Sequence, residues 1–412
     1  MRKYRFPLLL LFILATFASL PAHGQEVEDT IKIRTRVVFL DALVKDKKTN
    51  LPISNLTTEN FQVLDDGKPR DISYFTREGQ ARKPLALILI LDLRADGAGR
   101  FLKEPAILKS MEDELAKLPP GDEVAIMAMD MNNEDEERLW LTEFTNDRAK
   151  LAAALARVPA MSVSHDGEQA EKKSEVAKTD TTGGKPDDIV ETETIKGSNG
   201  GTVIRETRRD GRVNVKRTNK KGDVTIDLGD VYDMAAAVKD ATRKGEETRP
   251  NSQLSIVWVS DGIAPIFFED RDATEQVLIR KNVIFNSLTV DLRTLFKFLL
   301  PVAKPIGGWL GMSLYGSAKY LAGRSGGEAV KVGRVKDYGA GLSKIIGNLT
   351  ARYSLGFALA EDEVDDGRMH SLQVQVKAQD EKGKTRKLQV SSRQGYYMSS
   401  TISKDTAAKA QF

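Results

Sequence analysis

The chain has 412 residues, and its 62 lysine and arginine residues nearly balance its 59 aspartate and glutamate residues, leaving a net charge of +3. This balance gives no reason to propose nucleic acid as a partner. The chain contains no cysteine, which excludes disulfides, thiol nucleophiles, thiolate metal sites and a lipid anchor on cysteine. Its length predicts two or three domains and is sufficient for an adequate core without disulfides.

The N-terminus has the pattern of an export signal. Cations are concentrated in residues 1–5, an uncharged apolar run extends from Phe6 to Leu20, and small residues precede Gln25. The apolar run is too short for a permanent membrane span, and acidic residues follow it at once. We therefore expect a signal peptide over residues 1–24 and an exported protein, periplasmic or secreted, with no membrane span after cleavage. An uncleaved N-terminal anchor is the alternative.

Residues 26–82 have the pattern of a small β module. Apolar and polar residues alternate over 31–40, which predicts a half-buried strand. Asp66-Gly67 lies between two strand-like runs and indicates a hairpin. Strand-like patterning returns over 351–398, before a frayed tail at 399–412. Because the two ends of one domain often lie close together, these C-terminal strands are candidates to join the N-terminal module.

The pattern changes at Leu85–Leu91, a continuous apolar run that ends at Asp92. Such runs are typical of strands buried on both faces of a parallel sheet. Further strand-like runs occur at 124–129, 138–144, 254–259 and 283–290. Helical patterns occur between and after them, at 107–118, 147–158, 231–243, 272–280 and 337–349. This alternation predicts a doubly wound, mostly parallel α/β sheet over 83–350, with β segments on either side.

A charged, low-complexity insertion at 162–223 interrupts the α/β pattern. Ser162–Lys185 has too few apolar side chains to offset the entropy of ordering, so we expect it to be mobile. Residues 202–226 contain short valine and isoleucine runs separated by glycine-containing turns. They predict either a hairpin carried on an arm or a solvated charged tether.

The order of these segments resembles the VWFA-related Acidobacterial domain family, whose members contain a von Willebrand factor A-like domain. The motifs that carry the resemblance include Asn55–Phe61, Val63–Lys68, Pro120–Val124, Val259–Gly262 and Tyr353–Phe357. The match extends from about Ile31 to Tyr397, interrupted by the insertion. The resemblance implies a Rossmann-type doubly wound sheet.

The resemblance also implies a metal-ion-dependent adhesion site at the carboxyl edge of the sheet. In von Willebrand factor A domains, the ligands come from an Asp-x-Ser-x-Ser motif after the first strand, a threonine from a later loop and an aspartate after the fourth strand. Hard oxygen ligands with an open position suit Mg²⁺ and a ligand carboxylate. The location agrees with the rule that open α/β sheets bind ligands at the carboxyl ends of their strands.

This sequence matches the adhesion site only in part. Asp92 matches the first aspartate, and Asp261, within Ser260–Gly262, matches the last. The remaining positions lack hydroxyls: Arg94 and Asp96 replace the serines, and Gly229 and Asp230 stand where the threonine would be.

Arginine cannot ligate a cation, so we expect a degenerate, cation-free site in which Arg94 pairs with Asp92 or Asp261. One alternative is a rebuilt Mg²⁺ site that uses Asp92, Asp96 and Asp261, together with Asp230. The other is that these loop residues are simply solvated.

The sequence gives little sign of catalysis. Gly323–Gly327 matches G-x-S-x-G, but a helical segment precedes it and a strand-like segment follows, the reverse of a nucleophile elbow. We interpret it as a helix C-cap turn, with a hydrolase on Ser325 as a further alternative. His165 and His370 are interpreted as solvated loop histidines rather than general bases. No glycine-rich phosphate loop occurs.

These observations predict a non-enzymatic binding protein that acts in protein–protein interaction or adhesion. The binding surface would be the loops at 92–99, 229–230 and 260–266, with a protein partner and no cofactor unless the Mg²⁺ site is rebuilt. The alternative is a structural or assembly role in the cell envelope, with an inert A-like domain and the insertion as the working part. The apolar stretch Leu295–Leu310 is expected to pack on the sheet top or, alternatively, to form an exposed contact surface.

Overall fold

The computed structural model describes residues 36–77, 82–93, 99–129, 140–161, 189–197, 200–208, 213–231, 233–290, 311–379 and 383–398. The predictions for the signal peptide, for Ser162–Lys185, for Leu295–Leu310 and for the tail lie outside these residues. No helix within the described ranges is both long and apolar enough to cross a membrane.

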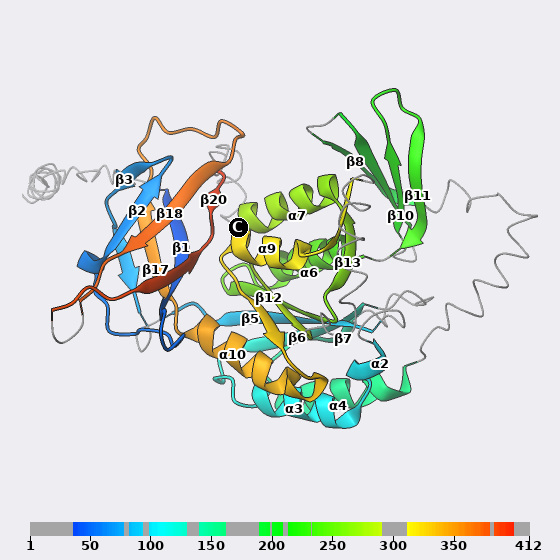
Figure 1. Ribbon diagram of the computed structural model, residues 1–412, viewed down its shortest axis with the longest axis horizontal. Coiled ribbons are helices and arrows are strands. Elements are labelled where there is room, and N and C mark those ends of the chain that lie inside the picture. Colours follow the sequence, from blue (N-terminus) through cyan, green and yellow to red (C-terminus); the bar gives the residue numbers. More distant parts are fainter. Residues whose placement is uncertain are drawn as a thin grey trace, which may run out of the picture. The chain divides into compact units, whose positions relative to one another are not determined.

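A six-stranded sheet forms the centre of the α/β domain (Figure 1), and its order is β16-β14-β12-β5-β6-β7. The parallel strands are β5 (Leu85–Asp92), β6 (Glu123–Met129), β12 (Gln253–Ser260), β14 (Ile284–Val290) and β16 (Ala329–Val332). The edge strand β7 (Trp140–Thr145) is antiparallel to β6. Counted along the chain, the order is 3-2-1-4-5-6, that of a doubly wound sheet. The predicted fold class, a doubly wound and mostly parallel α/β sheet, is confirmed.

Strand β5 lies between β12 and β6, and all of its residues are buried. Such a strand needs helices on both faces of the sheet to exclude water. One face packs against α3 (Pro105–Leu115), α4 (Arg148–Arg157) and α10 (Tyr338–Thr350). The other packs against α6 (Met234–Thr248), α7 (Phe268–Arg280) and α9 (Ser317–Ser325), as Figure 1 shows. The short helix α2 (Gly99–Leu102) and the two-stranded sheet of β13 (Ile263–Phe267) and β15 (Met312–Tyr315) complete this domain.

The β module consists of two four-stranded antiparallel sheets that each combine N-terminal and C-terminal strands. Strand β1 (Val37–Asp46) pairs with β17 (Tyr353–Ala358) and β19 (Leu388–Ser392). Strand β2 (Phe61–Asp65) pairs with β18 (His370–Val376). The remaining strands are β3 (Lys68–Arg70), β4 (Tyr74–Thr76) and β20 (Gly395–Tyr396). The C-terminal strands therefore join the N-terminal module, as the sequence suggested.

The insertion contains a folded antiparallel sheet, which we call the arm. Its strands, in spatial order, are β8 (Ile189–Lys196), β9 (Thr202–Arg208), β10 (Val213–Thr218) and β11 (Val224–Val231). The hairpin prediction for 202–226 is confirmed and the tether alternative is wrong, because Val203 and Val215 are fully buried in a core cluster with α6 and α7. The expected end of the insertion at residue 223 falls in the turn between β10 and β11.

Candidate site at the carboxyl edge of the sheet

Asp92 and Asp261 lie close together at the ends of the two central strands. Asp92 ends β5 and Ser260 ends β12, and the register of these parallel strands pairs Leu91 with Val259. The Ser260 hydroxyl donates to Asp92 Oδ2 at 2.7 Å and lies 3.4 Å from Asp261 Oδ1. The structure thus brings together three of the seven predicted site residues, while their role in binding stays a prediction.

Hydrogen bonds from several elements hold this cluster in a buried position. Asp92 is 0% exposed and Asp261 is 3% exposed. The backbone N–H of Ile263 donates to Asp261 Oδ1 at 2.8 Å, which fixes the turn after β12. The Tyr338 hydroxyl, from the start of α10, donates to the Ser260 carbonyl at 2.9 Å. Burial, and then the charges of Asp261 and Asp92, raise the pKa of Tyr338. Sequence reasoning missed Tyr338 because its spacing resembles that of an ordinary core residue.

The other predicted residues are placed differently. Arg94 and Asp96 lie outside the described residues. Gly229 and Asp230 belong to strand β11 of the arm, where Asp230 pairs with Asn214 of β10. They are therefore strand residues and not part of a loop of the central sheet, because the arm extends to within three residues of α6.

The described oxygen donors fit the Mg²⁺ ion that the resemblance implies only in part. Mg²⁺ takes about six oxygen ligands in near-octahedral geometry. The cluster offers two carboxylates and one hydroxyl, and that hydroxyl already donates its hydrogen to Asp92. The sequence supplies no hydroxyl at the two serine positions or the threonine position. We therefore assign no step of function to a bound cation.

The arm docks at this same edge of the sheet through a buried arginine. Arg205 of β9 is 3% exposed and donates to Asp233 Oδ1 at 3.0 Å and to Asp270 Oδ2 at 2.7 Å. Asp233 is the N-cap of α6, and Asp270 lies in the first turn of α7. Helix α6 ends just before β12 begins, and α7 starts after β12 ends, so both helices begin at the carboxyl edge of the sheet. Arg205 therefore joins the arm to the edge that carries Asp92 and Asp261.

One positive side chain, Arg205, meets two acidic side chains, Asp233 and Asp270, at this docking point. Burial raises the pKa of Asp270 to about 6; Arg205 acts against this rise and the Asp233 carboxylate adds to it. Burial acts in the same direction on Asp233, but the Arg205 charge and its hydrogen bonds outweigh burial and lower the pKa of that carboxyl. One guanidinium thus faces two carboxyl groups, of which Asp233 holds the negative charge more readily.

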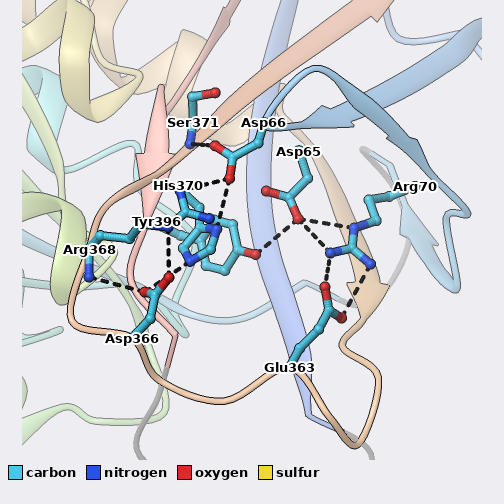
Figure 2. A network of polar contacts seen from close by, with 9 residues as sticks. All are labelled: Asp65, Asp66, Arg70, Glu363, Asp366, Arg368, His370, Ser371 and Tyr396. Carbon is cyan, nitrogen blue, oxygen red and sulfur yellow. Dashed lines mark hydrogen bonds and ion pairs between the residues drawn. The ribbon is translucent and has the colours of Figure 1, made fainter.

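A second polar network lies in the β module and centres on His370 (Figure 2). His370 begins β18 and is 3% exposed, so its interpretation as a solvated loop histidine is wrong. Its Nδ1 lies 3.0 Å from Asp66 Oδ2 and its Nε2 lies 3.3 Å from Asp366 Oδ1. The ring is buried because β18 pairs with β20, whose Tyr396 ring lies 5.1 Å away between centroids. His165 lies outside the described residues.

One ligand atom from each of Asp65, Asp66 and His370 lies within 4.8 Å of the others, close enough to hold a metal ion. Both carboxylates already have cationic partners, since Arg70 donates to Asp65 at 2.7 Å and Arg368 pairs with Asp66 at 2.9 Å. Burial acts to raise the pKa of Asp66, but the Ser371 N–H and Arg368 lower it to about 2. The network therefore joins the acidic loop before β18 to the β2–β3 hairpin (Figure 2) and does not favour a divalent cation.

Ser325 has a structural environment. Its side chain accepts a hydrogen bond from the backbone N–H of Phe285 at 3.0 Å, and the residue is 3% exposed. Gly326, with φ of +84°, caps α9 by donating to Ala322. The helix C-cap interpretation is confirmed, because only glycine adopts this conformation without strain. The hydrolase hypothesis gains no support from a hydroxyl enclosed in this way.

No family model and no curated protein matches the chain. Similar solved structures include the VWA domain of SpRpn10, with a TM-score of 0.30 and 9% identity over 64% of this chain and 94% of that chain. A von Willebrand factor type A protein from Catenulispora acidiphila has a TM-score of 0.36 and 8% identity over 85% of this chain and 76% of that one. The manganese-loaded TRAP protein of Plasmodium vivax has a TM-score of 0.32 and 12% identity over 78% and 96%. The strand order, rather than these distant likenesses, carries the fold assignment.

Proposed function

We propose that the protein is an exported, non-enzymatic binding protein that captures a protein partner through the loops at the carboxyl edge of its central sheet. The observation that supports this proposal is the joining of Asp92, Ser260 and Asp261 where β5 and β12 end. Open α/β sheets bind their ligands at this edge. The arm, fixed there by Arg205, adds a second chain segment to the same surface.

In this proposal the two carboxylates organise the loops and do not coordinate a cation. Asp92 accepts from the Ser260 hydroxyl and so links the ends of β5 and β12. Asp261 accepts from the Ile263 N–H and so positions the chain that leaves β12. A buried carboxylate that accepts backbone hydrogen bonds stabilises a loop geometry without a metal. We therefore expect binding to be independent of divalent cations.

The test is retention of partners from a cell-envelope extract on the immobilised chain, with and without EDTA. We expect Asp261→Asn to lose a partner that the wild-type chain retains, and EDTA to have no effect. The matched control is Asp272→Asn. Asp272 is an exposed aspartate on α7 whose side chain pairs with its neighbour Arg271 at 2.9 Å. Unchanged retention by Asp261→Asn would rule out this surface, and loss on EDTA would favour the rebuilt Mg²⁺ site.

Export and the lack of enzymatic activity are the parts of the proposal that rest on the sequence. N-terminal sequencing of the mature protein from fractionated cells tests cleavage after Gly24. A hydrolase assay on the wild-type chain and on Ser325→Ala tests catalysis, and activity lost in that variant would contradict the proposal.

The envelope-scaffold alternative gives the arm the working role. The arm exposes Val190 on β8 and Val224 on β11, at 56% and 57% exposure. Deletion of 162–223 is a poor test because it would remove β8, β9 and β10 and leave β11 without its strand partner. The double variant Val190→Ser/Val224→Ser leaves the sheet intact. Loss of the partner in this variant, with normal retention by Asp261→Asn, would favour the alternative.

A further inference from the structure

A cavity of about 70 Å³ lies at the opposite, amino edge of the central sheet, where the β module meets the α/β domain. Leu85 and Gln253, the first residues of β5 and β12, contribute to its wall. Phe39 of β1 and Tyr74 of β4 form its apolar side, with ring centroids 5.2 Å apart in an edge-on arrangement. This cavity is separate from the proposed partner-binding surface, which lies at the other end of the same strands.

The cavity is rich in positive charge. Its charged lining residues, among those that the structure describes, are Asp41, Arg77, Arg82, Lys83 and Arg352. Arg82 is engaged by Asp122 at 2.6 Å, and the exposed Lys83 ammonium lies 5.2 Å from the centre of the Phe39 ring. Cations therefore outnumber carboxylates around a space that is partly closed to solvent, and such a space favours an anionic ligand.

Arg352 is the residue that points to a ligand. It connects α10 to β17 and is 8% exposed. Its Nη2 donates to the Gly326 carbonyl at 2.8 Å, but Nε and Nη1 are buried and have no hydrogen-bond partner among the described residues. A buried charged donor without an acceptor is destabilising, because it has lost its hydrogen bonds to water and gained none in their place.

The acidic groups near Arg352 are occupied by other side chains. Glu328 pairs with Lys45 and also accepts from Asn348. Asp41 accepts from the hydroxyl of Ser354. Burial lowers the pKa of Arg352, although Asp41 and Glu328 oppose the shift, so the surrounding protein does not fully compensate this charge.

We propose that this cavity binds a small oxyanion, a carboxylate or phosphate group, that accepts hydrogen bonds from the Arg352 guanidinium. Lys83 at the mouth supplies a second positive charge, and Phe39 and Tyr74 provide an apolar wall for whatever group carries the anion. The size of the cavity limits the ligand. One water needs roughly 10–15 Å³ by the same measure, so the space suits a single anionic group and not a nucleotide.

The test uses inorganic phosphate and benzoate as separate probes, each against sodium chloride at equal ionic strength to remove general screening. Calorimetry and thermal unfolding of the full mature chain report binding, because a ligand that binds the folded state raises Tm in a saturable way. We expect one probe to bind and to raise Tm, and its identity distinguishes the phosphate source from the carboxylate source. Arg352→Gln should weaken this binding at least roughly tenfold.

Lys387→Gln is the matched control, since Lys387 is an exposed cation of the β module outside the cavity, and it should bind as the wild-type chain does. Lys83→Gln changes an exposed side chain, so it keeps the proposal testable if Arg352→Gln does not fold, and it should weaken binding several-fold. Equal binding by wild-type protein and both cavity variants would overturn the proposal. Lack of saturable binding of either probe up to about 10 mM would overturn it as well.

Discussion

The docking of the arm depends on Arg205, and Arg205→Met tests this dependence. The substitution keeps an unbranched side chain of similar length but removes the charge between Asp233 and Asp270, whose side chains are 12% and 0% exposed. Removing one partner of a buried ion pair costs about 3–5 kcal/mol, because the remaining charges stay buried without compensation. That cost falls on the contact between the arm and the helices α6 and α7, while β8–β11 can remain paired with one another.

We therefore expect the arm to detach locally in Arg205→Met at about pH 7. A loss of about 3 kcal/mol increases the open population on the order of 100-fold. Hydrogen exchange of the backbone amides of α6 and α7, together with limited proteolysis between residues 189 and 231, measures this opening. The control is Lys216→Met on β10, which removes a partly exposed pair with Glu206 at 3.9 Å that contributes less than about 1 kcal/mol.

Acid should partly restore docking in the Arg205→Met variant. The pKa of Asp270 is raised to about 6 in the folded protein, so its ionisation opposes folding as the pH rises from the unfolded value of 3.8. Arg205 lowers this pKa in the wild-type protein, so its loss raises the pKa further and the carboxyl of the variant is neutral below about pH 5. The penalty of removing Arg205 therefore falls in acid. Asp270→Asn in the Arg205→Met background should act in the same way at neutral pH while leaving the Asp233 N-cap in place. Exchange no faster in Arg205→Met than in Lys216→Met would refute the argument.

Three further outcomes are expected. Tyr338→Phe removes the donor to the buried Ser260 carbonyl and should lower stability by about 1–2 kcal/mol in denaturant unfolding, whereas an unchanged midpoint would show that water replaces the hydroxyl. Leu89→Ala, in the middle of β5, should cost about 2–5 kcal/mol in the same assay, and a cost below 1 kcal/mol would contradict a close-packed central strand. The pKa of Asp66 is lowered to about 2, so its contribution is present above the unfolded value of 3.8 and is lost as the pH falls toward 2. Because that side chain is 34% exposed, Asp66→Asn should lose less than about 1 kcal/mol at neutral pH and show a flatter acid titration of stability than wild type.

The central sheet could be predicted from local sequence pattern, and the closeness of its end residues from the family resemblance. The run Leu85–Leu91 is apolar on both faces, which only a covered strand requires. The carboxyl ends of parallel strands meet at one edge. The family resemblance identified Asp92, at the end of β5, and Asp261, after β12, as residues of one site at that edge. Val203 and Val215 lie in short apolar runs, and these runs were enough to suggest the hairpin as one of the two interpretations of residues 202–226.

The docking of the arm and the burial of His370 could not be predicted, because both depend on partners distant in sequence. Arg205 contacts Asp233 and Asp270, which lie 28 and 65 positions away, and an arginine in a charged insertion otherwise resembles a solvated one. His370 follows an acidic loop, which suggests exposure, but it faces Asp66, 304 positions away, across the module. Strand β8 was missed because its alternate residues are largely exposed, which leaves only a weak apolar face.

The shared strands of the β module have a consequence for how the chain acquires its structure. Strands β1 and β2 pair with β17 and β18, so they can form their sheets only when the C-terminal part of the chain is present. The same two parts of the chain are joined by the Tyr353 hydroxyl, which donates to the Ile53 carbonyl 300 positions away. The α/β domain between them is built from strands and helices that follow one another in sequence, so it can assemble first. Its assembly brings the two halves of the β module together and shortens the effective loop that must close. A truncation after α10 would remove the partners of β1 and β2 and expose their edges to pairing with other molecules. We therefore expect the shortened chain to aggregate while its central sheet still forms.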